Sequence, residues 1–201
     1  VGSEMCIRDS YHRAKYLLKF RKAKNVIILA PAIATNMTWI PFLTINKERF
    51  RTIQTAGDLN NIPEGTFLVV STSMLRKLKR GLMRFVKRTS GKLCLVFDES
   101  DEITNPTSQR TRNILCIFRR LRYKILDTGT TTRNNIAELY SQFELLYNNS
   151  VNMICWSPQV YHENRDHEIE EENNPHYGEP FPAFRGHVLF RACHCPGKST
   201  V

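Results

Sequence analysis

The chain has 201 residues, with 29 Lys and Arg against 19 Asp and Glu, and a formal net charge of +10. Hydrophobic residues make up 41% of it, enough for the core of one ordinary domain with an appendage. No run approaches the ~18–20 apolar residues of a membrane span, and the six cysteines show no disulfide-framework spacing. These features exclude a membrane-spanning protein and a disulfide-rich secreted domain, and they favour a reducing, cytoplasmic setting.

The amino-terminal residues divide into two parts. Residues 1–10 fit no helix or strand period and lack the regions of a signal peptide, so we interpret them as a non-native, adapter-derived leader. Residues 11–24 carry six Lys and Arg and no acid in an amphipathic pattern, which predicts a basic helix. We therefore expect the folded part to begin near residue 11.

Short apolar runs recur farther along the chain, as is typical of strands buried on both faces of a parallel sheet. They occupy residues 26–30, 67–70, 93–97 and 123–127, with a weaker candidate at 51–54. Helices are predicted between and after them, one following Pro31 and containing Trp39, and others near 75–86, 114–121 and 136–143. This alternation predicts an α/β fold, with one parallel sheet between two layers of helices.

Polar side chains follow two of these strands. Asp98 and Glu99 come directly after the strand at 93–97, where open α/β sheets bind ligands. In nucleotide-hydrolysing proteins such an Asp holds Mg²⁺, and the next acid orients the attacking water; the alternative is a strand that ends in a solvated acidic turn. Ser71, Thr72 and Ser73 follow the strand at 67–70, and we expect them to cap the next helix or to contact phosphate.

Several motifs agree with one family in order and spacing. Asp98-Glu99 is followed by Ile-Thr-Asn-Pro-Thr-Ser at 103–108, by Thr-Gly-Thr at 128–130 with Asn-Asn at 134–135, and by Glu-Leu-Tyr-Ser at 138–141. Together they resemble the motifs of the Swi/Snf-type DNA-dependent ATPases of helicase superfamily two. The resemblance covers residues 11–150 and is concentrated in 93–147. The sequence departs from the family pattern at Asp101, Thr131 and Arg133, where the family has His, Pro and Gln. These departures bear on how the nucleotide-bound state is coupled to DNA binding.

This resemblance implies a RecA-like three-layer domain with a mostly parallel central sheet, incomplete at both ends. ATP and Mg²⁺ would be the cofactors, with Asp98 at the metal and Glu99 at the attacking water. Duplex DNA would be the partner. The other implied roles are coupling for Asp101, Thr128, Gly129 and Thr130, and DNA contact for Pro31, Thr35, Ser71 and Thr72.

The family also has parts that residues 11–150 do not contain. Its phosphate loop is expected just upstream of residue 11, and a second RecA-like lobe is expected beyond this chain. On this interpretation the chain is a fragment of an ATP-hydrolysing translocase and is itself inactive.

Basic runs indicate a polyanion partner. Residues 76–92 carry eight Lys and Arg and residues 109–124 carry six, in both cases without an acid. With the run at 11–24 they favour nucleic acid, and we expect Arg76 and Lys77 to contact DNA phosphates. The alternative function is a non-catalytic basic nucleic-acid-binding domain on the same fold.

The pattern changes in residues 151–201, which we interpret as an insert or tail. Residues 162–179 hold seven acids and one Arg, typical of a solvated segment. The Gly-Lys-Ser at 197–199 formally resembles a phosphate loop, but Pro196 supplies no N–H and the order along the chain is wrong. Cys193, His194 and Cys195 lack the usual zinc-ligand gap, so free thiols are favoured over a zinc enzyme.

Overall fold

A computed structural model describes residues 2–129 and 136–147 of the chain. The predictions made for Thr130, Thr131, Arg133 and residues 151–201 lie outside these described residues. Within the described part, no helix is long and apolar enough to cross a membrane.

The predicted sheet is confirmed. Five strands form one sheet in the order β2-β3-β1-β4-β5, and every pairing is parallel. The weak candidate is the edge strand β2, which is shorter than expected. The strands are β1 (Asn25–Ala30), β2 (Phe50–Thr52), β3 (Phe67–Ser71), β4 (Leu93–Phe97) and β5 (Tyr123–Leu126).

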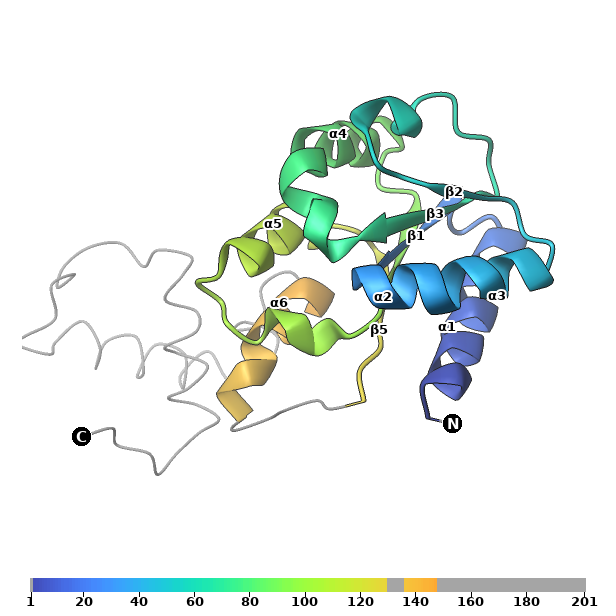
Figure 1. The fold of residues 1–201 in the computed structure, drawn as a ribbon. Helices are drawn as coiled ribbons and strands as arrows, with labels where there is room; N and C mark the ends of the chain where they lie inside the picture. The colour runs from blue at the N-terminus through green and yellow to red at the C-terminus, as the bar shows by residue number, and fades with distance from the viewer. Residues whose placement is uncertain (1, 130–135, 148–201) are drawn as a thin grey trace, which may run out of the picture.

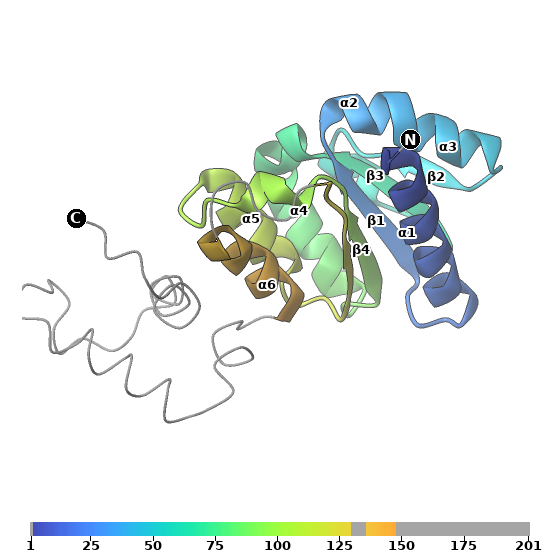
Figure 2. The same cartoon turned by 90° about the horizontal axis from the view of Figure 1, so that it is seen from below.

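Helices cover both faces of the sheet (Figures 1 and 2). One face carries α1 (Gly2–Lys19) and the continuous helical segment α2 (Ala32–Ala34), π-helical Thr35–Trp39 and α3 (Ile40–Ile45). The other face carries α4 (Leu75–Arg88), α5 (Gln109–Phe118) and α6 (Tyr140–Tyr147). The result is the predicted three-layer α/β arrangement.

The three central strands, β1, β3 and β4, are almost entirely apolar because each buries both of its faces, whereas the edge strands β2 and β5 are only partly buried and contain Arg51 and Lys124. Side chains alternate across a strand, so Ile27 and Leu29 of β1 join the core under α4 and α5, whereas Val26 and Ile28 join the core under α1 and α3. All four are fully buried. This two-sided burial explains why strand and core could be predicted from short apolar runs alone.

The prediction that residues 1–10 fit no helical period is wrong. Helix α1 begins at Gly2, and the side chains of Ile7 and Ser10 are only 4% and 1% exposed. Ile7, Tyr11 and Ala14 lie three and four residues apart, which places them on one helix face against the sheet. This helical pattern was missed because the sequence was divided after residue 10, which separates Ile7 from Tyr11 and Ala14 on the same helix face.

Candidate active site at the carboxyl edge of the sheet

Two acids on neighbouring strands meet where the strands end. Phe97 of β4 pairs with Leu126 of β5, so the residues that follow, Asp98 and Asp127, are also neighbours. Backbone hydrogen bonds continue the ladder past the strands: the Asp98 N–H donates to Leu29 O and the Asp127 N–H to Phe97 O, each at 2.9 Å. The sheet therefore brings two carboxylates together at its carboxyl edge.

The Asp98 carboxylate is fixed by two donors. The Trp39 indole Nε1 donates to Oδ2 at 2.8 Å, and the Glu99 backbone N–H donates to Oδ1 at 3.0 Å. Trp39 is fully buried, so its indole cannot easily turn away. Because an ionised carboxylate has about four acceptor positions, both oxygens can still accept from, or ligate, something else.

Glu99 marks a sharp turn directly after β4. Its backbone is left-handed, with φ 54° and ψ 50°, and its side chain is exposed while its neighbour Ser100 is fully buried. A non-glycine residue in this region is uncommon and is enriched at functional sites. The turn leads into a 3₁₀ segment, Ser100–Ile103, that carries further acids.

Crowding of carboxylates makes this edge electrostatically unusual. Burial raises the pKa of Glu99, and the negative charges of Asp98 and Asp101 raise it further. The pKa of Asp127 is also raised, chiefly by burial and partly by the Asp98 charge, although the Ser10 hydroxyl bond and Arg13 oppose this. Several carboxylates thus share a small volume with little compensating positive charge, which favours a cation or a protonated acid.

Two residues at this edge were missed by sequence reasoning. Asp127 was seen only as the end of a strand, although the rule that selected Asp98 applies to it equally. Ser10 donates its hydroxyl to Asp127 Oδ2 but was assigned to the leader. A hydrogen bond was missed as well. Nothing in the sequence indicates that Trp39 contacts Asp98, because the two residues lie 59 positions apart.

The predicted coupling residues lie beside the acids. Asp101 is 4% exposed within the 3₁₀ turn, and its side chain is hydrogen-bonded to Glu99. Thr128 follows Asp127 directly and is half-buried, and Gly129 is exposed. Asp101 therefore contacts one of the two catalytic candidates, Glu99. Thr130 is not among the described residues.

The donor set fits a magnesium–nucleotide complex better than a metal held by protein alone. Within residues 2–129 and 136–147, no three His, Cys, Asp or Glu side chains are grouped so as to hold a metal ion. Mg²⁺, however, typically takes only one or two protein carboxylates and completes its shell with water and phosphate oxygens. Asp98, with Glu99 beside it, has the chemistry for that role.

The loops predicted to contact DNA are only partly exposed. The Thr35 side chain is 3% exposed and its hydroxyl donates to Ala30 O at 3.4 Å, and Thr72 is 6% exposed. Pro31 is half-buried. Ser71 and Ser73 bond to each other through their hydroxyls at 2.8 Å. The predicted capping role is wrong, because the N-cap of α4 is Met74 and no side-chain cap is made there.

Helix α4 presents a stripe of positive charge to solvent. At 3.6 residues per turn, six of its basic residues fall within about 120° of its circumference. All six are exposed, and none forms an ion pair with any other described residue. They are Arg76, Lys77, Arg80, Arg84, Lys87 and Arg88, called here the α4 stripe.

Comparison with known proteins identifies the fold. No protein-family model matches the chain, and no curated protein matches its sequence. Its structure is similar to the Sulfolobus solfataricus SWI2/SNF2 ATPase core in complex with dsDNA, with a TM-score of 0.50 and 16% identity. The fold is RecA-like. The alignment covers 90% of this chain but 34% of the Sulfolobus chain, so this chain spans about a third of the length of that chain.

Proposed function

We propose that this RecA-like chain is the first lobe of an ATP-dependent DNA translocase of the Swi/Snf type. The observation that carries the proposal is the fixed Asp98 carboxylate, held by Trp39 at the carboxyl end of β4 and followed at once by the left-handed, exposed Glu99. A likeness at 16% identity supports the fold alone. The functional part therefore rests on these acids and on the sequence motifs around them.

Asp98 and Glu99 would have different tasks. Asp98 is immobilised by two donors and would hold the magnesium of a bound ATP. Bound Mg²⁺ would neutralise charge on the phosphate oxygens. Partial burial of the Glu99 carboxyl group, and then the nearby charges of Asp98 and Asp101, raise its pKa and make it a better proton acceptor for the attacking water.

Asp101, Thr128, Gly129 and Thr130 would couple the nucleotide state to DNA. Asp101 is hydrogen-bonded to Glu99, and Thr128 directly follows Asp127, the neighbour of Asp98 in the sheet. A displacement of the acids would therefore also displace Asp101 and Thr128. We add Asp127 to this group as a positioning residue. Its partner Ser10 ties the edge of the sheet to helix α1.

Duplex DNA would be held by the loop after β3 and by the start of the α4 stripe. Ser71, Arg76 and Lys77 are the accessible members of that region, whereas the Thr35 and Thr72 side chains are buried. Lys and Arg contacts of this kind bind the phosphate backbone without reading sequence. Pro31 and Thr35 would act by shaping the loop and would contact DNA only if it opened.

A complete cycle would also need a phosphate loop and a second lobe. Chain 1–201 by itself should therefore show no DNA-stimulated ATP hydrolysis in a coupled assay. If turnover appeared and was lost on Lys198→Ala, the Gly-Lys-Ser at 197–199 would be a working phosphate loop, and our assignment of the site would fail.

A second candidate function is a non-catalytic nucleic-acid-binding domain. The unpaired cations of the α4 stripe favour it, since they would serve DNA binding without any hydrolysis. The two candidate functions differ in whether the acids at the carboxyl edge bind a divalent cation. If Mn²⁺ added together with ATP, followed by paramagnetic broadening of amide signals, bound near Asp98 and was lost on Asp98→Asn, the ATPase would be supported; no binding of the Mn²⁺–ATP complex there would favour the alternative.

A further inference from the structure

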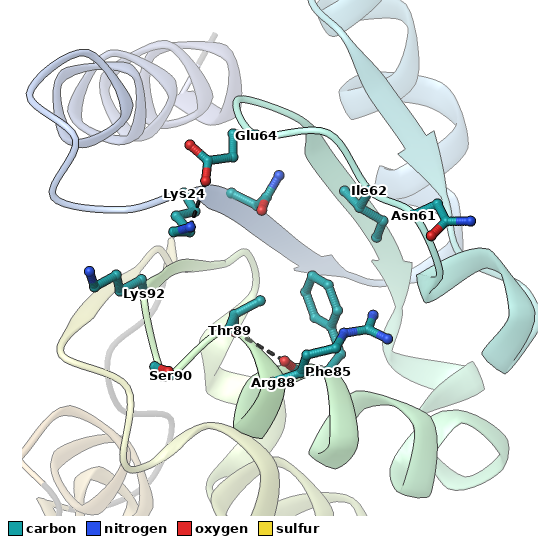
Figure 3. A pocket seen from close by; sticks show the side chains of 10 residues that line it. Lys24, Asn61, Ile62, Glu64, Phe85, Arg88, Thr89, Ser90 and Lys92 are labelled. Atoms are coloured by element: carbon teal, nitrogen blue, oxygen red, sulfur yellow. Dashed lines mark hydrogen bonds and ion pairs between the residues drawn. The ribbon is translucent and has the colours of Figure 1, made fainter.

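A polar hollow lies at the amino edge of the sheet, at the opposite ends of the strands from the acids (Figure 3). Its cavity volume is about 450 Å³, within the range of small-ligand sites. The start of β1, the loop before β3 and the end of α4 with the turn after it form its walls. Its lining residues are Lys24, Asn25, Asn61, Ile62, Glu64, Phe85, Arg88, Thr89, Ser90 and Lys92, called here the amino-edge pocket.

Hydrogen-bond donors dominate this pocket. The cations Lys24, Arg88 and Lys92 line it together with a single carboxylate, Glu64, and the Ser90 hydroxyl adds a further donor. The Thr89 hydroxyl already donates to the backbone carbonyls of Phe85 and Val86. An adjoining hollow of about 420 Å³ shares Lys24, Glu64 and Lys92 and adds Arg21. A site with this balance of charge suits an oxyanion.

Glu64 lies among cations on one side of the pocket, although its side chain is 70% exposed. Its Oε1 lies 2.6 Å from Lys24 Nζ, and its pKa is lowered by that bond, by the Lys24 charge and then by Arg21 and Lys92. Three cations therefore converge on one carboxylate. Arg21 and Lys92 have no ion pair of their own within the described part of the chain.

Arg88 is held in place on the other side of the pocket. Its Nη2 donates to Leu59 O at 2.5 Å, and its guanidinium lies over the Phe85 ring at 5.6 Å from the centroid. Figure 3 shows Lys24 and Lys92 on one side and Arg88 on the other, with Phe85 between them. The remaining guanidinium N–H groups are free to form the paired hydrogen bonds that Arg makes with phosphate.

We propose that the amino-edge pocket binds a phosphate group, carried either by a free nucleotide or by a nucleic-acid strand. Lys92 and Arg88 bind the phosphate oxygens, and the Ser90 hydroxyl donates a further bond. Glu64 competes with the incoming anion for Lys24 and sets the affinity. This site is separate from Asp98 and Glu99 and does not depend on the function proposed for them.

The test is an NMR titration of the full chain 1–201 with inorganic phosphate. Saturable shifts should be confined to amides near Lys24, Glu64 and 90–92. Lys92→Gln should weaken binding about five- to tenfold, as loss of one charge-assisted contact predicts. Glu64→Gln should tighten it severalfold, because the competing carboxylate is removed. Misfolding cannot produce these opposite effects.

Arg112→Gln is the matched control, since Arg112 is an exposed cation on α5 outside the pocket. It should leave phosphate binding unchanged. A nucleoside monophosphate and a single-stranded oligonucleotide then distinguish the two sources. Tighter binding of the monophosphate supports a nucleotide, and tighter, strongly salt-dependent binding of the oligonucleotide supports a strand. No saturable shift, shifts only at the carboxyl edge, or equal effects of Arg112→Gln and Lys92→Gln would overturn the proposal.

Discussion

At the scale of single residues, the acids at the carboxyl edge carry an electrostatic cost. Glu99 is exposed, yet burial of its carboxyl group and the nearby charges of Asp98 and Asp101 raise its pKa. The fold therefore favours the neutral form of Glu99. Stability from this preference is present below the ordinary pKa of a Glu and is lost as the pH rises through the raised value.

This sign gives a direct prediction for Glu99→Gln. At neutral pH the substitution should raise the melting temperature by about one or two degrees, because it removes an unfavourable charge. The difference should vanish below the ordinary Glu pKa, where Glu99 is protonated in both the folded and unfolded states. Thermal melts between acidic and neutral pH would measure it.

Glu64→Gln is the control with the opposite sign. The bond to Lys24 lowers the pKa of Glu64, so its ionised form is the favoured one. Its substitution should slightly lower the melting temperature at neutral pH and have no effect at acidic pH. A Glu99→Gln variant that is destabilised at neutral pH would contradict the charge crowding described here.

The same residues show how far sequence reasoning reaches. The position of Asp98 and Glu99 at the carboxyl end of a buried strand was predictable because an apolar run followed by acids is a local pattern. The Trp39–Asp98 bond depends on where the helix after β1 lies on the sheet, and no local pattern contains that information. The burial of the Thr35 hydroxyl could not be predicted either, because it depends on a π-helical turn that the sequence did not indicate.

At the scale of elements, helix α1 is part of the folded lobe from its first turns. Ile7 is buried between α1 and the sheet, so Ile7→Ala should lower the free energy of unfolding by about 2–4 kcal/mol. Arg8→Ala, next to it on the exposed side, should change it by less than about 0.5 kcal/mol. Urea unfolding of both variants would show whether Ile7 packs as described; equal, small effects would mean that it does not.

Helix α4 packs one face into the core and exposes basic residues on the other, so substitutions on the exposed face test DNA binding without disturbing the core. Arg76 and Arg80 lie on the α4 stripe, whereas Lys79 lies off it and is half-buried. Log affinity for duplex DNA should fall by about 0.9 per log unit of salt for each phosphate contact. Replacing Arg76 and Arg80 with Gln should therefore flatten the salt slope by about one to two units in fluorescence-anisotropy titrations.

Lys79→Gln gives the comparison on the same helix and should leave the slope unchanged. A slope that is insensitive to Arg76 and Arg80 would mean that the α4 stripe is only a solvated face. The net charge of +10 would then need another explanation.

At the scale of the whole molecule, the sheet was predictable and its surroundings were not. Fully buried parallel strands are continuous apolar runs, so their number, order along the chain and direction followed from the sequence. The helical pattern that includes Ile7 and Ser10 was missed, and their contacts with the sheet and with Asp127 are with residues far along the chain. Opposite edges of the same sheet carry opposite charge, with acids at the carboxyl ends and Lys and Arg around the amino-edge pocket.

In the proposed function, Glu99 acts on the attacking water in ATP hydrolysis. Duplex-DNA-stimulated ATP turnover, measured in the protein encoded by the full open reading frame that contains these residues, tests this role. Glu99→Gln should lower kcat by about 10²–10⁴-fold while ATP binding changes by about twofold or less. Glu102→Gln, in the same turn but paired with Arg110 at 3.2 Å, should keep most of the activity. Full turnover in Glu99→Gln, or equal loss in both variants, would contradict the account.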